Sequence, residues 1–177
     1  MQWQVIRITD ITPDEYAAIY AALSDSRRTH IDRMRVEVNR HRSLAATALA
    51  ARIPGVAISA IETDDAGRPS IAGDARHISI SHSGDTVAVA VGDEPVGIDI
   101  EEMRPVEEKL IHYVCTPAER DYVCAATGDE RTRRFFSVWT AKEALFKRDG
   151  GSLRAIDTLT AEKRVATVLD GCFVTVV

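Results

Sequence analysis

The most constraining feature of this sequence is a run of short strand-like segments between residues 77 and 101 with no helical pattern between them. The segments are HISIS, TVAVAV and VGIDIE, and GDEP separates the last two. Parallel strands need long crossovers, so contiguous strands favour antiparallel pairing. We expect TVAVAV and VGIDIE to form an antiparallel hairpin around this four-residue turn, with a further strand over residues 56–62. The pattern predicts an α+β protein and disfavours a parallel Rossmann sheet.

Helix-start signatures occur on both sides of these strands. The sequence Thr-Pro-x-Glu, which can form a capping box with proline in the first turn, occurs at Thr12–Glu15 and again at Thr116–Glu119. A longer helical pattern follows each, from Arg27 toward Gly55 and from about Asp129 to Arg148. This repeated order of a capped helix and a longer helix predicts two similar α+β halves in a pseudo-two-fold arrangement, with antiparallel strands packed on helices. We place them at residues 1–103 and 104–177, with the second half shortened.

Composition excludes several classes of protein. The net charge is −5, which is not the signature of a nucleic-acid-binding protein. No apolar run approaches the ~20 residues of a membrane span, and the first residues do not resemble a secretory signal. Three cysteines without a C-x-x-C motif suit a reducing compartment better than a disulfide framework or a zinc site. We expect a cytoplasmic protein without nucleic-acid or membrane partners.

Acidic residues mark the strand VGIDIE. Asp99 and Glu101 share one strand face because side chains alternate with a period of two. Such a pair either faces solvent at a strand end or points inward, where it needs a cation. With Glu143 added, three carboxylates would form a hard-oxygen set suited to Mg²⁺.

The segment WTAKEALFKRDGG places Trp139, Glu143 and Lys147 on one helix face, because positions four apart stack. The ordinary explanation is a surface Glu–Lys pair, which contributes a few tenths of a kcal/mol. Convergence with the acidic strand would instead give the pair a chemical role.

Basic residues concentrate between Arg27 and Arg42, where six Arg oppose Asp32 and Glu37, a local balance of 6 − 2 = +4. This cluster is either a solvated helix face or a site for a small polyanion such as a nucleotide phosphate. Ser81 and His82 in ISISHSGD could also bind a phosphate at a strand end. A Ser–His–Asp triad is disfavoured there, because adjacent residues of a strand point to opposite faces. Arg68 in GRP is by itself a turn residue.

Four blocks occur in one order: the Arg-rich segment ending HRSL, then GRP, then ISISHSGDTVAVAVGDEPVGIDIE, then WTAKEALFK. Together they resemble 4′-phosphopantetheinyl transferases of the Sfp-like type, which modify carrier proteins, over about Arg27 to Ser152. The smaller holo-acyl-carrier-protein synthases, which are trimers, begin near their G-I-D block. Nearly a hundred residues precede that block here, so the resemblance implies a pseudo-dimeric monomer.

The resemblance implies an enzyme that moves 4′-phosphopantetheine from coenzyme A to a serine of an apo carrier protein and releases 3′,5′-ADP. Asp99, Glu101 and Glu143 would hold Mg²⁺. Glu143 would accept the serine proton, and Lys147 would stabilise the pyrophosphate and the leaving group. The implied coenzyme A contacts are Arg27, His30, Arg42, Arg68, Pro69, Ser81, His82 and Lys147.

Two departures from the family pattern affect these expectations. His30 stands where Lys or Arg is expected, which predicts weaker or pH-sensitive binding of the 3′-phosphate. The residues after the late helix are few, so the second sheet is expected to be trimmed.

The segment after Met103 is the candidate carrier surface, although Leu110, Ile111 and Val114 could equally be core. Two alternatives remain: a Mg²⁺-dependent pyrophosphate or nucleotide hydrolase, and a non-catalytic homologue that binds coenzyme A or a carrier.

Overall fold

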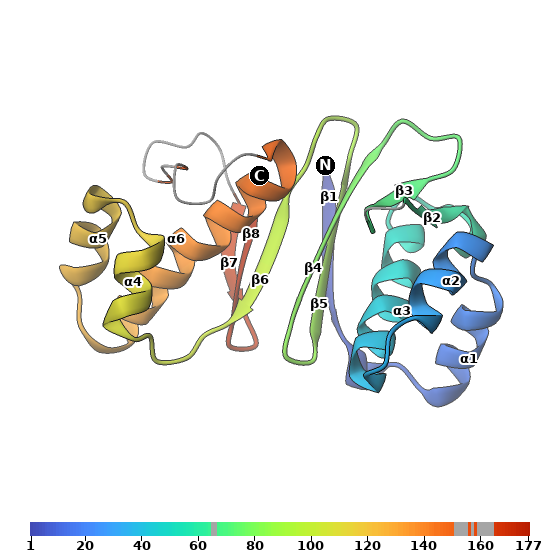
Figure 1. The fold of residues 1–177 in the computed structure, drawn as a ribbon, viewed down its shortest axis with the longest axis horizontal. Coiled ribbons are helices and arrows are strands. Elements are labelled where there is room, and N and C mark those ends of the chain that lie inside the picture. The colour runs from blue at the N-terminus through green and yellow to red at the C-terminus, as the bar shows by residue number, and fades with distance from the viewer. Residues whose placement is uncertain (65–66, 151–155, 157, 159–164) are drawn as a thin grey trace. The chain divides into compact units, whose positions relative to one another are not determined.

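The computed structural model describes residues 1–64, 67–150, 156, 158 and 165–177. The chain forms two compact units, Met1–Val96 and Gly97–Val177, each with helices packed on an antiparallel sheet (Figure 1). The predicted α+β class is confirmed, whereas the two-fold relation between halves stays a prediction. The division falls before β6 (Ile98–Glu102) and not at residue 103, because β6 pairs with β8 (Cys172–Val176). Asp99 and Glu101 therefore belong to the second unit.

The main sheet of the first unit has three antiparallel strands, in the order β1 (Gln2–Arg7), β5 (Thr86–Gly92), β4 (His77–Ser83). The expected hairpin of TVAVAV with VGIDIE is wrong, since β5 pairs with β1 and β4 while β6 pairs with β8. A two-residue turn, Gly84–Asp85, joins β4 to β5, and Gly84 has a φ of 52°. Tight turns that begin with such a glycine match the twist of paired strands, so this connection forms the hairpin.

The N-terminal strand β1 was not anticipated. It pairs with β5 in a register that sets Trp3 opposite Ala90 and Val5 opposite Ala88. Its sequence, QWQVIR, alternates polar and apolar residues over the first four positions, which is the signal that could have identified it.

The helices of the first unit are α1 (Pro13–Ala21), α2 (Asp25–Asp32) and α3 (Glu37–Arg52). The capping box at Thr12 and Glu15 is confirmed, whereas the single long helix expected from Arg27 is interrupted between α2 and α3. The break brings Ile31 of α2 into a buried cluster with Tyr16, Leu23 and Leu44. The strand expected over residues 56–62 is mostly a 3-10 turn, Ile58–Ala60, followed by β2 (Ile61–Thr63), which pairs with β3 (Pro69–Ile71).

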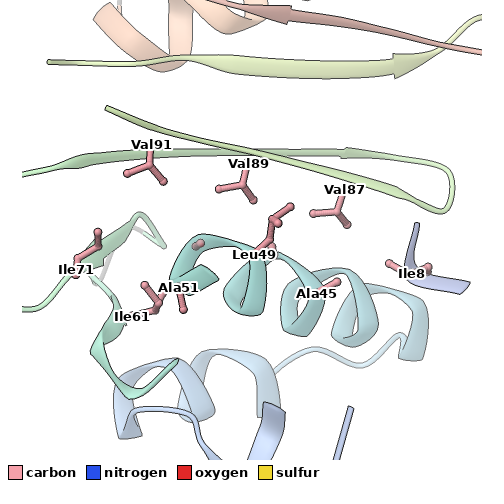
Figure 2. Packing of buried hydrophobic residues seen from close by; sticks show 11 residues of the cluster. Ile8, Ala45, Leu49, Ala51, Ile61, Ile71, Val87, Val89 and Val91 are labelled. Carbon is pink, nitrogen blue, oxygen red and sulfur yellow. The ribbon is translucent and has the colours of Figure 1, made fainter. Parts of the chain in front are cut away.

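The core of the first unit lies between β5 and α3. Val87, Val89 and Val91 point from one face of β5 toward Leu49 and Ala45 of α3 (Figure 2). All seven residues of β5 are buried, which explains why its sequence reads as a continuous apolar run.

The second unit contains a three-stranded antiparallel sheet in the order β6, β8, β7 (Val165–Leu169). Its helices are α4 (Glu108–Val114), α5 (Pro117–Cys124) and α6 (Gly128–Asp149). The capping box at Thr116 and the late helix are confirmed, and α6 ends at Asp149, before Gly150, whose φ is 75°. Across the described residues, none of the helices combines the length and the apolar character needed to cross a membrane.

Candidate functional site

The acidic residues singled out by sequence lie on two adjoining elements of the second unit. Asp99 and Glu101 are on β6, while Glu143 and Lys147 are on α6, which packs along β6 and β8. The packing is close at Gly97, where an added Cβ would lie 1.8 Å from the carbonyl oxygen of Ala144. Only glycine permits that approach, which explains the glycine of the G-I-D sequence.

Lys147 forms an ion pair with Asp99. Its Nζ lies 2.7 Å from Asp99 Oδ1 and donates a second hydrogen bond, of 3.1 Å, to the carbonyl of Ile98. The Asp99 side chain is 5% exposed and that of Lys147 is 27% exposed. Because the Asp99 carboxylate is buried, salt screens this pair less than a fully exposed one, and the pair fixes the ammonium beside the strand.

The indole of Trp139 holds Glu101. Trp139 Nε1 donates a 3.2 Å hydrogen bond to Glu101 Oε1, and the indole stacks on Phe135 with ring centroids 6.2 Å apart. Trp139 therefore connects the core of the second unit to a carboxylate of the candidate site.

Glu143 is half-buried, and its pKa is raised above the ordinary value. Burial is the main cause. The charges of Asp99 and Glu101 raise the pKa further, and Lys147 partly offsets them. These causes indicate that the Glu143 carboxylate interacts electrostatically with Asp99, Glu101 and Lys147. The metal-binding and catalytic roles of these residues stay predictions.

The chemistry of this donor set fits a hard divalent cation, because a cation would offset both the burial and the neighbouring negative charges that raise the pKa of Glu143. The side chains are not already gathered around one point: among described residues, no group of three or more His, Cys, Asp or Glu is placed to hold a metal ion. The magnesium assignment therefore stays a prediction.

Arg27, in the first unit, is a buried guanidinium and not a surface group, with 4% of its area exposed. It donates to the hydroxyls of Thr47 (2.7 Å), Thr63 (2.9 Å) and Ser43 (3.0 Å). Burial lowers its pKa to about 10. Within the described part of the chain, the hydrogen-bond acceptors found for Arg27 carry no charge, so its positive charge is not neutralised locally.

His30 and the GRP turn lie near Arg27. His30 is half-buried, and burial, followed by the charges of Arg27 and Arg33, lowers its pKa. A Cβ added to Gly67 would lie 3.7 Å from Cε1 of His30, which places the turn containing Arg68 and Pro69 beside the imidazole. Arg68 is exposed, and Pro69 begins β3.

Arg42 lies in the N-terminal half of α3, next to Ser43, and its Nε and Nη2 donate to the carbonyl of Gly84 at 2.9 and 2.6 Å. This contact places Arg42 at the turn that follows β4. Ser81 is buried and His82 exposed on that strand, as expected for adjacent residues on opposite faces, which argues further against a triad.

The second unit also has a groove of about 480 Å³ next to Glu101 and Trp139. Ile111 and Val114 are core residues, with 1% and 6% exposed, whereas Leu110 is 38% exposed and lines the groove.

The sequence analysis did not single out Lys142, and it identified Glu119 only as part of a capping box. The side chains of these two residues form a buried ion pair. A lysine between the apolar residues of α6 was the available signal.

Comparison with known proteins identifies the family. Residues 95–168 match the model of the 4'-phosphopantetheinyl transferase superfamily. A 4'-phosphopantetheinyl transferase of Bacillus subtilis is 31% identical over 150 residues, covering 81% of this chain and 67% of the relative. Sfp of Bacillus subtilis is 36% identical over 93 residues, covering 51% and 41%. AcpT of Salmonella typhimurium is 38% identical over 90 residues, covering 49% and 47%.

The matched segments of Sfp and of psf-1 from Bacillus pumilus amount to 41% and 39% of the length of those relatives. The longer alignment includes both units of this chain, because 150 aligned residues exceed the length of either. The chain belongs to the 4′-phosphopantetheinyl transferase superfamily.

Proposed function

We propose that this protein transfers 4′-phosphopantetheine from coenzyme A to a serine hydroxyl of an apo carrier protein. The observation that carries the proposal is the half-buried Glu143 beside Asp99, Glu101 and Lys147, in a chain of this family. Asp99, Glu101 and Glu143 would hold Mg²⁺, which supplies charge stabilisation to a pyrophosphate.

Glu143 is the proposed general base. Its raised pKa makes it a better proton acceptor than an ordinary carboxylate, and a serine hydroxyl is a weak nucleophile without a base. The serine oxygen bonds to the β-phosphorus of coenzyme A, and the bond to the bridging oxygen breaks. Glu143 takes the serine proton, and the electron pair leaves with 3′,5′-ADP. The ammonium of Lys147 is suited to the charge that develops on the leaving phosphate.

Basic residues of the first unit are the proposed phosphate contacts. Arg27 supports this role because its buried charge has only neutral acceptors in the described part of the chain, and a phosphate would compensate it. His30 lies on the same helix as Arg27, α2, and Arg68 lies in the turn beside the imidazole of His30. The remaining proposed coenzyme A contacts are Arg42, Pro69, Ser81 and His82.

The groove beside Trp139 is the proposed surface for the carrier protein. Exposed Leu110 gives it an apolar wall, and Arg104 and Lys109 on its lining suit an acidic partner. We expect the protein to act on the carrier as a monomer.

The test is intact-protein mass spectrometry of an apo carrier incubated with this protein, coenzyme A and Mg²⁺, with EDTA as the control. We expect the carrier to gain one phosphopantetheine group only when the metal is present. Consumption of coenzyme A without a modified carrier would support the hydrolase alternative. Coenzyme A binding without either reaction, across several carrier classes, would support a non-catalytic homologue.

Replacement of Glu143 identifies the base. We expect Glu143→Gln to reduce transfer by about 100-fold or more, because the amide cannot accept the proton, while coenzyme A binding is largely kept. Asp121→Asn, an exposed carboxylate of the same unit, is the matched control. Undiminished transfer by Glu143→Gln would remove Glu143 from the mechanism.

A further inference from the structure

The turn of α6 that carries Glu143 also carries a buried lysine. Lys142 is 1% exposed, its Nζ lies 2.9 Å from Oε2 of Glu119 on α5, and it also donates to the backbone carbonyl of Ile156. Burying an ammonium and a carboxylate is costly, and an apolar pair of similar volume often stabilises a fold equally well. A buried pair at this position therefore calls for a reason other than stability.

Glu119 is saturated with hydrogen bonds. Its Oε2 accepts from the backbone N–H of Thr116 at 2.8 Å, and its Oε1 accepts from the N–H and the hydroxyl of Thr158 at 2.9 and 2.8 Å. Burial by itself would raise the pKa of Glu119, but the hydrogen bonds from Thr158, Lys142 and Thr116 lower it, so the group is a carboxylate at neutral pH. The pair thus joins the start of α5, the middle of α6 and Thr158.

The first unit shows that a capping box does not need this arrangement. Glu15 makes the same reciprocal hydrogen bonds with Thr12 at the start of α1, yet it is exposed. The cap on α5 would form equally well with an exposed glutamate, so Lys142 serves something beyond the helix start.

Other contacts hold the same stretch of α6 on its sheet side. Because Gly97 has no side chain, the Ala144 carbonyl of α6 packs closely on the start of β6. The hydroxyl of Thr140 on α6 also lies 2.7 Å from that of Thr175 on β8. Lys142 and Glu119 act on the side of α6 that faces α5, which flanks it in Figure 1. The segment from Trp139 to Lys147 is thus held from both sides.

We propose that the Lys142–Glu119 pair is a positioning device. It sets the rotation of α6 so that the Glu143 carboxylate faces Asp99 and Glu101 and the Trp139 indole reaches Glu101. A directional pair fixes one rotation of the helix, whereas an apolar pair would tolerate several. Its catalytic consequence rests on the proposed transferase function, but the geometric claim does not.

The experiment uses Trp139 as the reporter of helix rotation. The chain has two tryptophans, so Trp3→Phe leaves Trp139 as the sole indole. The indole N–H resonance in ¹⁵N-correlated NMR spectra reports its hydrogen bond to Glu101 through its chemical shift and solvent exchange. In this background we compare Lys142→Met, Glu119→Gln and the double variant Lys142→Met/Glu119→Gln, with Glu15→Gln as the control.

We expect both single variants to shift the indole resonance and speed its exchange, and to lower kcat about tenfold or more with KM for coenzyme A changed less than about threefold. Lys142→Met also lowers Tm, because it leaves the buried Glu119 carboxylate without its ion-pair partner. The double variant recovers the Tm of the parent but not its kcat or its indole resonance. Glu15→Gln leaves the resonance and kcat unchanged. If Lys142→Met fails to fold, Glu119→Gln alone carries the comparison.

The proposal is overturned if the variants lower Tm while the indole resonance and kcat stay as in the parent, or if the double variant recovers all three. Either result would make the pair a stability element only. Absence of transfer by the parent protein would count against the proposed function and would leave the NMR comparison to decide the positioning claim.

Discussion

At the scale of single residues, Glu143 and His30, a candidate base and a candidate phosphate contact, occupy environments that shift their pKa values. Burial and neighbouring carboxylates raise the pKa of Glu143, and burial with neighbouring arginines lowers that of His30. Each shift opposes the charged form, so each group would be relieved by a ligand of opposite charge, a cation at Glu143 and an anion at His30.

We expect His30 to make the affinity for coenzyme A depend on pH. Its lowered pKa means that it is neutral near pH 7, whereas a phosphate would favour the imidazolium, so its contribution to binding grows as the pH falls. We expect His30→Arg, whose charge is permanent, to tighten binding at about pH 8 by roughly tenfold and to flatten this dependence. Calorimetric titration of coenzyme A at about pH 6 and about pH 8 measures both effects.

Dephospho-coenzyme A is the control for this titration, because it lacks the 3′-phosphate. The two proteins should bind it with equal affinity at each pH. If His30→Arg changed the affinity for dephospho-coenzyme A as much as the affinity for coenzyme A, His30 would not contact the 3′-phosphate.

Gly97 limits the distance between β6 and α6. We expect Gly97→Ala to lower the free energy of unfolding by about 3 kcal/mol or more, because the new Cβ would collide with the Ala144 carbonyl and force α6 away. Urea unfolding followed by Trp139 fluorescence measures the loss.

Gly92→Ala is the matched variant, since its Cβ would meet nothing closer than the Glu94 carbonyl at 3.1 Å. Its cost should stay within about 1 kcal/mol. Equal losses for the two variants would contradict the close-packing explanation for Gly97.

At the scale of elements, local signals at helix starts were reliable, because a cap depends on residues only three positions apart. Both capping boxes formed as the Thr-Pro-x-Glu sequences predicted. Strand pairing was less predictable, because the apolar pattern of β5 specifies burial and not the identity of its partners.

The two caps should contribute similarly. In each, the threonine hydroxyl accepts a 3.3 Å hydrogen bond from the backbone N–H of the glutamate. We expect Thr12→Ala and Thr116→Ala each to cost about 1 kcal/mol of unfolding free energy, and the serine variants at both positions to retain most of it. Equilibrium urea unfolding checks this, and a serine variant as unstable as alanine would show that the methyl group matters more than the cap.

At the scale of the whole molecule, each unit has a hydrophobic core of its own. Leu49 belongs to the core of the first unit and Phe135 to that of the second, and both are 1% exposed. The two tryptophans are similarly divided, with Trp3 on β1 and Trp139 on α6.

Core truncations should therefore act on the unit that contains them. We expect Leu49→Ala to cost about 2–5 kcal/mol, seen mainly in the transition reported by Trp3, and Phe135→Ala to cost about 3–5 kcal/mol, seen mainly with Trp139. Fluorescence unfolding in Trp139→Phe and Trp3→Phe backgrounds separates the two reporters. Identical displacement of both transitions by each truncation would show that the chain unfolds as one cooperative unit.

The sequence alone determined the α+β class, both capped helices, the extent of α6 and the same-face pairs Asp99/Glu101 and Glu143/Lys147. These follow from contacts or periodicities within a few residues, which the order of amino acids specifies directly. The run TVAVAV was likewise predicted to be a strand, and it forms β5.

Only the tertiary structure decided which strands pair, where the long N-terminal helix breaks, and what surrounds each charged group. β6 lies with β8, and Arg27 proved to be buried. Lys142 and Glu119, 23 positions apart in sequence (142 − 119), form an ion pair inside the second unit. Such contacts join residues distant in the chain, so their energies depend on burial and on partners that no local pattern encodes.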